Sequence, residues 1–263
     1  MSLNLGIIAS SRTTSGGGGG TDADAQAFFN RVTAAGGTLS MTEQTAVNTL
    51  TVSLKSTGIW SKMRVIYPMV GASSAACSQN LKSALFTGTF SGSWNYASTG
   101  VTPLAGATLE SPLNLNTMNS INDISFGYYC RVNTSSVGSF GWYLAGNPNV
   151  QFFSRYTDNN RYGYIFDSNN SGGASTDSRG LNSISRISST QKMMQKNGTI
   201  STFTAASSGS LFSKNFSFTN GSQGQEFQRE NAFGFIADGL TSTNLTDLYT
   251  AVQAFQTTLL RQV

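Results

Sequence analysis

The chain has 263 residues and 27.9 kDa, with 16 Lys and Arg against 12 Asp and Glu, which allows one large domain with a small appendage. It contains no histidine, which excludes Ser-His-Asp and Cys-His catalytic systems and zinc sites with histidine ligands. The basic residues are scattered and no apolar run reaches about 18 residues, so neither nucleic-acid binding nor a membrane span is expected.

Residues 1 to 20 are predicted to form a flexible, Gly-rich attachment arm. An apolar head containing Leu3, Leu5, Ile7 and Ile8 is followed by a polar stretch and then by five consecutive glycines. Five glycines hold no conformation by themselves, so they indicate a tether with an apolar end. A disordered terminus of no consequence is the alternative. The segment lacks the basic start and long apolar core of a signal peptide.

Residues 21 to 70 are predicted to form a helical lead-in. Thr21 is the expected N-cap of a first helix, which a pair of glycines ends. A second helix over residues 42 to 55 has apolar residues at i, i+3 and i+7, and Gly58 follows where a C-terminal cap belongs. A third short segment, residues 59 to 67, completes the expected helical unit.

Residues 71 to 240 are predicted to form a β-sandwich, because short strand-like segments alternate with turns rich in Gly, Asn, Asp and Ser. Asn197-Gly198 tolerates the positive φ angles of a two-residue type I′ turn and therefore marks a β-hairpin. In the segment from residue 124 to 132, Ile124, Phe126 and Tyr128 alternate with residues that face the other side. The expected strands are 85–90, 94–97, 124–132, 141–144, 151–156, 162–166, 183–187, 192–196, 199–203 and 232–236.

Residues 241 to 263 are predicted to form a C-terminal helix that packs back on the domain. Leu248, Val252 and Phe255 share one face of this helix. Cys77 and Cys130 match no motif, and two buried free thiols are favoured over a single disulfide.

The low charge directs the search for a binding site toward neutral ligands. Charged residues make up 11% of the chain, against about 25% in ordinary globular proteins, so hydroxyls and amides dominate its polar surface. Sugar rings stack on aromatic faces while such groups hold the hydroxyls. The candidate carbohydrate-binding aromatics are Trp94, Tyr96, Trp142, Tyr156 and Tyr162, with Tyr164 of the same type, and a place in the core is the alternative for each.

Enzymatic and metal chemistry are both disfavoured. The carboxylates of the β region do not form the close pair of a glycoside hydrolase strand motif, although that class remains an alternative. Residues 158–161 and 167–170 could supply oxygen ligands to calcium, but Asx-rich turns explain them without a metal. No cofactor and no catalytic residue is therefore expected.

Two stretches resemble a known group of proteins. They are residues 56–71, which read STGIWSKMRVIYPMVG and are followed by Asn80-Leu-Lys82, and a tail that comprises residues 232–240 and 255–263. They resemble virion proteins of tailed bacteriophages, especially those that infect Bacteroidetes. The resemblance implies a mainly β, concanavalin-like or laminin-G-like jelly-roll sandwich with a short helical lead-in, and Asn197-Gly198 stands at its usual hairpin.

The resemblance implies a non-enzymatic structural protein on the exterior of a virion assembled in the host cytoplasm. The N-terminal arm would anchor it, and its partners would be other virion proteins and further copies of itself. A receptor-binding module of the tail-fibre type that recognises host surface glycan is the alternative, and a glycan-degrading enzyme is a third reading. Head decoration, head fibre, tail fibre and baseplate all remain open positions.

Overall fold

A computed structural model describes residues 20–104, 106–135, 142–143, 150–168, 172–218 and 229–263. The attachment-arm residues Leu3, Leu5, Ile7 and Ile8 lie outside this part of the chain. In its β7 and β13 strands, the backbone alone is described for residues 142, 143 and 218.

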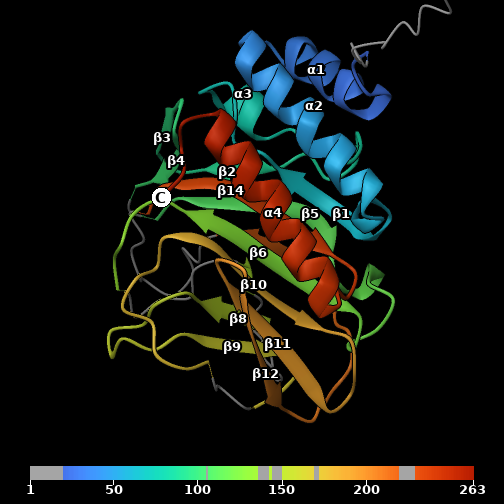
Figure 1. Cartoon of the computed structure of the whole chain (residues 1–263), viewed down its shortest axis with the longest axis vertical. Helices are drawn as coiled ribbons and strands as arrows, with labels where there is room; N and C mark the ends of the chain where they lie inside the picture. Colours follow the sequence, from blue (N-terminus) through green and yellow to red (C-terminus); the bar gives the residue numbers. More distant parts are fainter. Residues whose placement is uncertain (1–19, 105, 136–141, 144–149, 169–171, 219–228) are drawn as a thin grey trace, which may run out of the picture.

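Sheet A is the central layer of the fold (Figure 1). Its strands follow the order β12–β11–β10–β6–β14–β4–β3, β1 also pairs with β14, and all the pairs are antiparallel. The strands of this sheet are β1 (Met63–Tyr67), β3 (Trp94–Ala97), β4 (Gly100–Pro103), β6 (Ile124–Cys130), β10 (Gly180–Arg186), β11 (Gln191–Lys196), β12 (Thr199–Thr204) and β14 (Asn231–Ala237).

Two smaller sheets face the inner side of sheet A. Sheet B has the order β2–β5–β13–β7, and β8 pairs with β9 in a separate hairpin. Their strands are β2 (Thr89–Ser91), β5 (Thr108–Asn114), β7 (Trp142–Tyr143), β8 (Val150–Phe153), β9 (Tyr162–Ile165) and β13 (Asn215–Phe218). Phe126 and Tyr128 of β6 meet Phe216 and Phe152 across this interface, with ring centroids 6.4 and 5.9 Å apart. The core of the sandwich therefore lies between sheet A and the small sheets.

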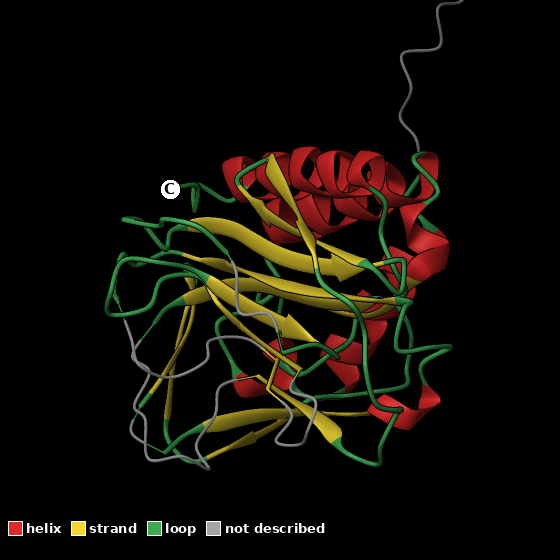
Figure 2. Cartoon of the chain, turned by 90° about the horizontal axis from the view of Figure 1, so that it is seen from below, coloured by secondary structure: helices red, strands yellow, loops and turns green. Residues whose placement is uncertain are grey.

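The helices cover the outer side of sheet A, and Figure 2 shows them together on that face. They are α1 (Ala23–Ala34), α2 (Met41–Ser56), α3 (Ser74–Cys77) and α4 (Ser242–Thr258), and 3₁₀ turns occur at Ile59–Lys62 and Leu115–Thr117. Phe233 and Phe235 of β14 join Leu248, Val252 and Phe255 of α4 in a second apolar core. Since α4 also packs along α2, the end of the chain is fixed to both the lead-in and the sheet.

The predicted fold class is confirmed: a mainly β sandwich carries helices at both ends of the described chain. Asn197 and Gly198 have φ angles of 47° and 82°, as the type I′ hairpin requires. Ile124, Phe126 and Tyr128 all face the sandwich core. The prediction of buried free thiols is also confirmed for Cys77 and Cys130.

Two predictions about the lead-in are wrong. Residues 59–67 are a 3₁₀ turn followed by strand β1, because Val65 and Ile66 pair with Ile236 and Phe235 of β14 instead of continuing a helix. The N-cap of α1 is Asp22 rather than Thr21, and its carboxylate accepts a hydrogen bond from the amide of Asp24 at 2.9 Å.

Besides β1, three strands were missed, namely β4, β5 and β13. Strand β5 contains Pro112, and proline cannot donate a hydrogen bond to a sheet. The register of β5 against β13 shifts between Ser111 and Asn114, so Pro112 lies at an irregularity where its missing N–H leaves no ladder bond unpaired.

Candidate functional site

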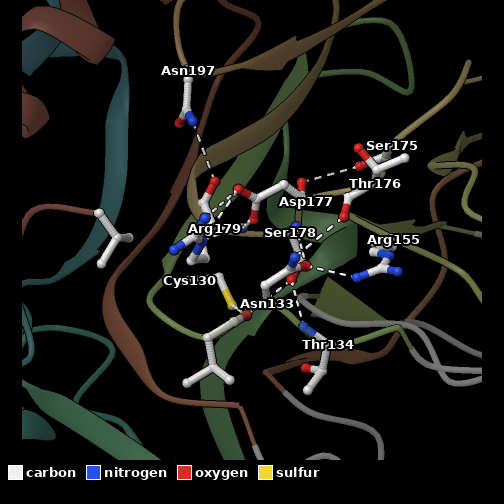
Figure 3. Close-up of polar contacts among 12 residues, drawn as sticks. Cys130, Asn133, Thr134, Arg155, Ser175, Thr176, Asp177, Ser178, Arg179 and Asn197 are labelled. Carbon is white, nitrogen blue, oxygen red and sulfur yellow. Dashed lines mark hydrogen bonds and ion pairs between the residues drawn. The ribbon is translucent and has the colours of Figure 1, made fainter.

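Three connections meet beside the β8–β9 hairpin, and we call them together the loop site: residues 131–134 after β6, 154–161 between β8 and β9, and 172–179 before β10 (Figure 3). Asn133 lies at their junction. Its side-chain oxygen accepts hydrogen bonds from Arg155 Nη1 at 2.8 Å and from the Ser178 amide at 3.1 Å. Its side-chain nitrogen donates to the Thr176 carbonyl at 3.2 Å. One amide side chain thus joins all three connections.

Arg155 extends this network to the tip of the hairpin. Its Nε and Nη2 donate to the Asn159 side-chain oxygen at 3.0 and 2.8 Å. Asn159 has φ 61°, a conformation that Asn adopts more readily than most residues. The Asp158 carboxylate accepts from the Asn160 amide at 3.0 Å, which is an Asx turn. The Asx-rich segment is thus a turn, as the sequence favoured.

A buried arginine, Arg229, donates hydrogen bonds to the loop site from the protein interior. Arg229 is almost completely buried, and its Nη1 donates to the Ser154 hydroxyl at 2.8 Å while Nη2 donates to the carbonyls of Thr134 and Arg155. Burial lowers the pKa of the Arg229 guanidinium. Since these acceptors belong to two connections, Arg229 fixes their backbones relative to each other.

A buried ion-pair cluster fixes the other end of the hairpin. The Asp167 carboxylate binds Arg186 Nη2 at 2.5 Å and Lys192 Nζ at 2.8 Å, and all three side chains are buried. The same cations donate to backbone carbonyls of β9, Arg186 to Ile165 at 2.7 Å and Lys192 to Gly163 at 2.6 Å. Burial lowers the pKa of the Lys192 amine. Lysine and arginine thus neutralise Asp167.

The predicted aromatic Tyr156 belongs to the loop site, and Tyr162 follows that site as the first residue of β9. They are half-buried and pack edge-to-face with ring centroids 5.6 Å apart, and Phe153 stacks on Tyr156 at the same spacing. The Tyr162 hydroxyl donates to Asp158, which raises the pKa of the tyrosine and lowers that of the carboxyl. Tyr164 lies farther along β9, with the Lys192 amine 5.8 Å from its ring centroid. Aromatic faces and amide groups are therefore combined in one place.

The other predicted aromatics do not join them. Trp94 and Tyr96 are half-buried on β3 at the edge of sheet A, and both pack edge-to-face on Phe90 with centroid distances of 4.8 and 5.3 Å. The indole of Trp94 donates to the Ser91 carbonyl at 3.1 Å. Trp142 has its backbone in β7, and its side chain lies outside the described residues. The five predicted residues thus do not form a single surface.

Each carboxylate of the loop site has its own partner. Asp177 binds Arg179 with Nη2 at 2.9 Å from its oxygen, and this hydrogen bond lowers the pKa of the Asp177 carboxyl. Asp158 binds Tyr162 and the turn amide. Within the described part of the chain, no three His, Cys, Asp or Glu side chains gather as metal ligands. Asp158 and Asp177 are thus each engaged by a neighbouring side chain.

Sequence reasoning missed Asn133, Arg155 and Arg229. Apart from the Arg155–Asn159 pair, which is four residues apart, their contacts join positions 22 to 95 residues apart, and the local sequence around each carries no distinguishing pattern. The Asx-rich turn at 158–161 was the one available signal.

Comparisons with solved structures agree on the fold. Domain 4 of AbnA, a GH43 extracellular arabinanase from Geobacillus stearothermophilus solved in complex with arabinotriose, matches with a TM-score of 0.51 at 15% identity, over 72% of this chain and 98% of that domain. Trypanosoma rangeli sialidase in complex with sialic acid matches with a TM-score of 0.56 at 7% identity. That match covers 74% of this chain and 34% of the sialidase.

At these identities the likeness concerns the β-sandwich alone. No protein-family model matches the chain, and neither does any curated protein. In the part of the chain that the structure describes, no helix has the length and apolarity needed to cross a membrane.

Proposed function

We propose that this chain is a non-enzymatic particle protein that displays a carbohydrate-binding β-sandwich on the exterior of a tailed phage, with residues 1–20 as its anchor. The observation that carries the binding part is the loop site, where Tyr156 and Tyr162 pack together on the hairpin that holds Asn159, and Arg155 joins Asn159 to the amide of Asn133. Ring faces and planar amides are the groups that recognise sugar rings and hydroxyls. The arabinanase domain named above was solved with an arabinose oligosaccharide, which supports the same ligand class.

Support for a particle protein comes from the stretches that carry the resemblance. Residues 56–71 contribute β1 and residues 232–240 contribute most of β14, and these strands pair with each other. The resemblance thus concerns one contiguous part of the fold. The low charge of 11% also suits a subunit packed among neighbours, where each buried charge would need a partner.

Binding without turnover is the expected chemistry. Asp158 and Asp177 are each engaged within the loop site, whereas glycoside hydrolysis needs two carboxylates held across one bond at about 5 to 10 Å. Neutral hydrogen bonds and ring contacts give weak affinity for one sugar. We expect a Kd from high micromolar to millimolar, about 4 to 6 kcal/mol, which many copies on a particle would raise.

A glycan array and a reducing-sugar release assay on the purified chain test this proposal. We expect binding to a subset of oligosaccharides and no release of product. Sustained release would contradict the non-enzymatic reading. Particles purified away from free protein should contain the chain, and its absence from them would contradict the virion assignment.

A further inference from the structure

A groove of about 430 Å³ lies away from the loop site, where the start of α2, the end of α4 and the β3–β4 turn meet. That volume is within the usual range of ligand pockets. Its lining includes the hydroxyl side chains of Ser40, Ser98 and Thr258 and the apolar side chains of Ala72 and Leu260. None of these residues belongs to the loop site, so the groove is a separate feature of the surface.

One lining side chain of the groove is unusually exposed, and so is one sequence neighbour of its lining residues. Leu260 is 89% exposed and Met41 is 85% exposed, and these are the two largest values among the large apolar side chains of the described chain. Leu260 lines the groove, and Met41 stands between the lining residues Ser40 and Thr42. Apolar side chains gathered at a concave site indicate an interaction surface.

The backbone of the groove is held in rare conformations. Leu260 has φ 55° just after the C-terminus of α4, where glycine is strongly preferred, and the lining residue Ala72 has φ 43°. A leucine at this position has an unfavourable backbone conformation, and its exposed side chain gains no stabilising burial. Strain of this kind concentrates at functional sites, so Leu260 has the features of a binding residue.

The electrostatics of the groove favour an uncharged occupant. Glu43 is its one charged lining residue, and its two carboxylate oxygens accept from the amides of Gly71 at 2.7 Å and Ser40 at 2.8 Å. No cation lines the groove to bind an anion. The hydroxyl side chains can instead bond the backbone of an extended peptide, with the exposed leucine against its side chains.

The chain contains one segment of that kind outside the described residues. Residues 2–9 carry no charged side chain, and Leu3, Leu5 and Ile7 would share one face if extended. Their tether leads to Asp22, which binds Asn48 and Lys55 of α2. The groove begins at Thr42 of the same helix, about 9 to 20 Å away along its axis. The linker of twelve residues, 10–21, is rich in Gly, Ser and Thr and spans about 17 to 21 Å.

We propose that the apolar head, residues 3–9, docks in the groove of its own chain. The linker length matches the distance, so the head is held near the groove at a high effective concentration. This goes beyond the anchoring role proposed above: before the arm engages a neighbour, the groove shields its apolar end.

A spin label at Ser2→Cys in the full chain tests the proposal, since Cys77 and Cys130 are completely buried and resist labelling. We expect the label to cause selective loss of the amide signals of Gly71 and Ser98. The signals should return in Leu5→Asp, which changes only the head, and in Leu260→Asp. Val52→Asp, on an exposed site of α2 at 48% exposure, is the matched control and should keep the loss.

Two results would overturn the proposal. Groove amides that keep full intensity would show that the head lies elsewhere. The second result comes from a mixture of two chains. One is isotope-enriched and carries no spin label, and the other carries the spin label but is not enriched. If the head docks in its own chain, the signals of the enriched chain stay intact. Loss of Gly71 and Ser98 signals in that mixture would show that the head binds a second copy instead. Neither result depends on glycan binding or on the presence of the chain in particles.

Discussion

The two faces of sheet A hold their covering layers by different means. On the outer face, α4 packs Leu248, Val252 and Phe255 into an apolar core with β14. On the inner face, the β8–β9 hairpin adds buried charged groups to its apolar contacts, with Asp167 between Arg186 and Lys192 and with Arg229 bonded to the loop site.

The apolar attachment mainly provides stability, whereas the charged attachment mainly fixes geometry. Apolar packing is non-directional and tolerates small shifts, so it suits a cover that has only to stay in place. Buried ion pairs contribute little net stability, but they satisfy their hydrogen bonds in one geometry alone. The loop site is held by buried charged groups of this kind, and they fix the positions of its amides and rings.

The largest expected effect is on the outer face. Phe255→Ala empties a buried aromatic site against Phe233 and should lower the free energy of unfolding by about 4 kcal/mol. Urea denaturation measures it, with Val52→Ala on the exposed side of α2 as a control that should change stability by less than about 0.5 kcal/mol. A loss under about 1 kcal/mol for Phe255→Ala would mean that α4 is peripheral.

The charged attachment is broken by Asp167→Asn. This change removes the negative charge that Arg186 and Lys192 share, but asparagine retains one acceptor oxygen, so we expect a loss of about 3 kcal/mol. Hydrogen exchange should show the loss first in β8 and β9. If Asp167→Asn is neutral, the hairpin is held by its apolar contacts and the comparison fails.

The loop site is tested by Arg155→Ala. Arg155 joins Asn133 to Asn159, so its loss should weaken sugar binding about tenfold, equal to about 1.4 kcal/mol, while the free energy of unfolding changes by less than about 1 kcal/mol. Titration calorimetry with an oligosaccharide found on the array measures the affinity. Arg64→Ala removes a surface ion pair with Asp238 elsewhere and should leave binding unchanged.

The smallest effect concerns pH. Burial lowers the pKa of Lys196, which donates to the Arg179 carbonyl beside the loop site, to about 8. Between about pH 8 and 10 the folded chain therefore binds fewer protons than the unfolded chain, and its stability should rise with pH. Because Lys196 is partly exposed, the rise should be about 1 kcal/mol. The urea midpoint of the original chain should rise between about pH 8 and 10, and that of Lys196→Met should change less with pH. An equal rise in both chains would show that Lys196 does not cause the effect.

Local signals in the sequence predicted what local physics decides. Asn197-Gly198 identified its hairpin because two positive φ angles are a property of those residues themselves. Residues 59–67 were misjudged because the state of β1 depends on β14, about 170 residues later. An apolar segment with no nearby partner gives no sign of which long-range pairing it will join.

The candidate site divides in the same way. Tyr156 and Tyr162 could be proposed by residue type, and they lie six positions apart on one hairpin. Trp94 shares their type, but no sequence signal shows that it packs on Phe90 at another sheet edge. Asn133 and Arg155 act only through contacts made by the fold.

The pairing of β1 with β14 also constrains how the chain is made. Arg261 donates a hydrogen bond to the carbonyl of Met69, 192 residues earlier, and so holds the segment that follows β1. At about 5 to 20 residues per second, roughly 10 to 40 s of synthesis separate these two partners. During that time β1 lacks the strand that completes it, and its apolar residues stay available to chaperones or to β1 of a neighbouring nascent chain. Slower translation late in the message would therefore be expected to cost yield rather than to help folding.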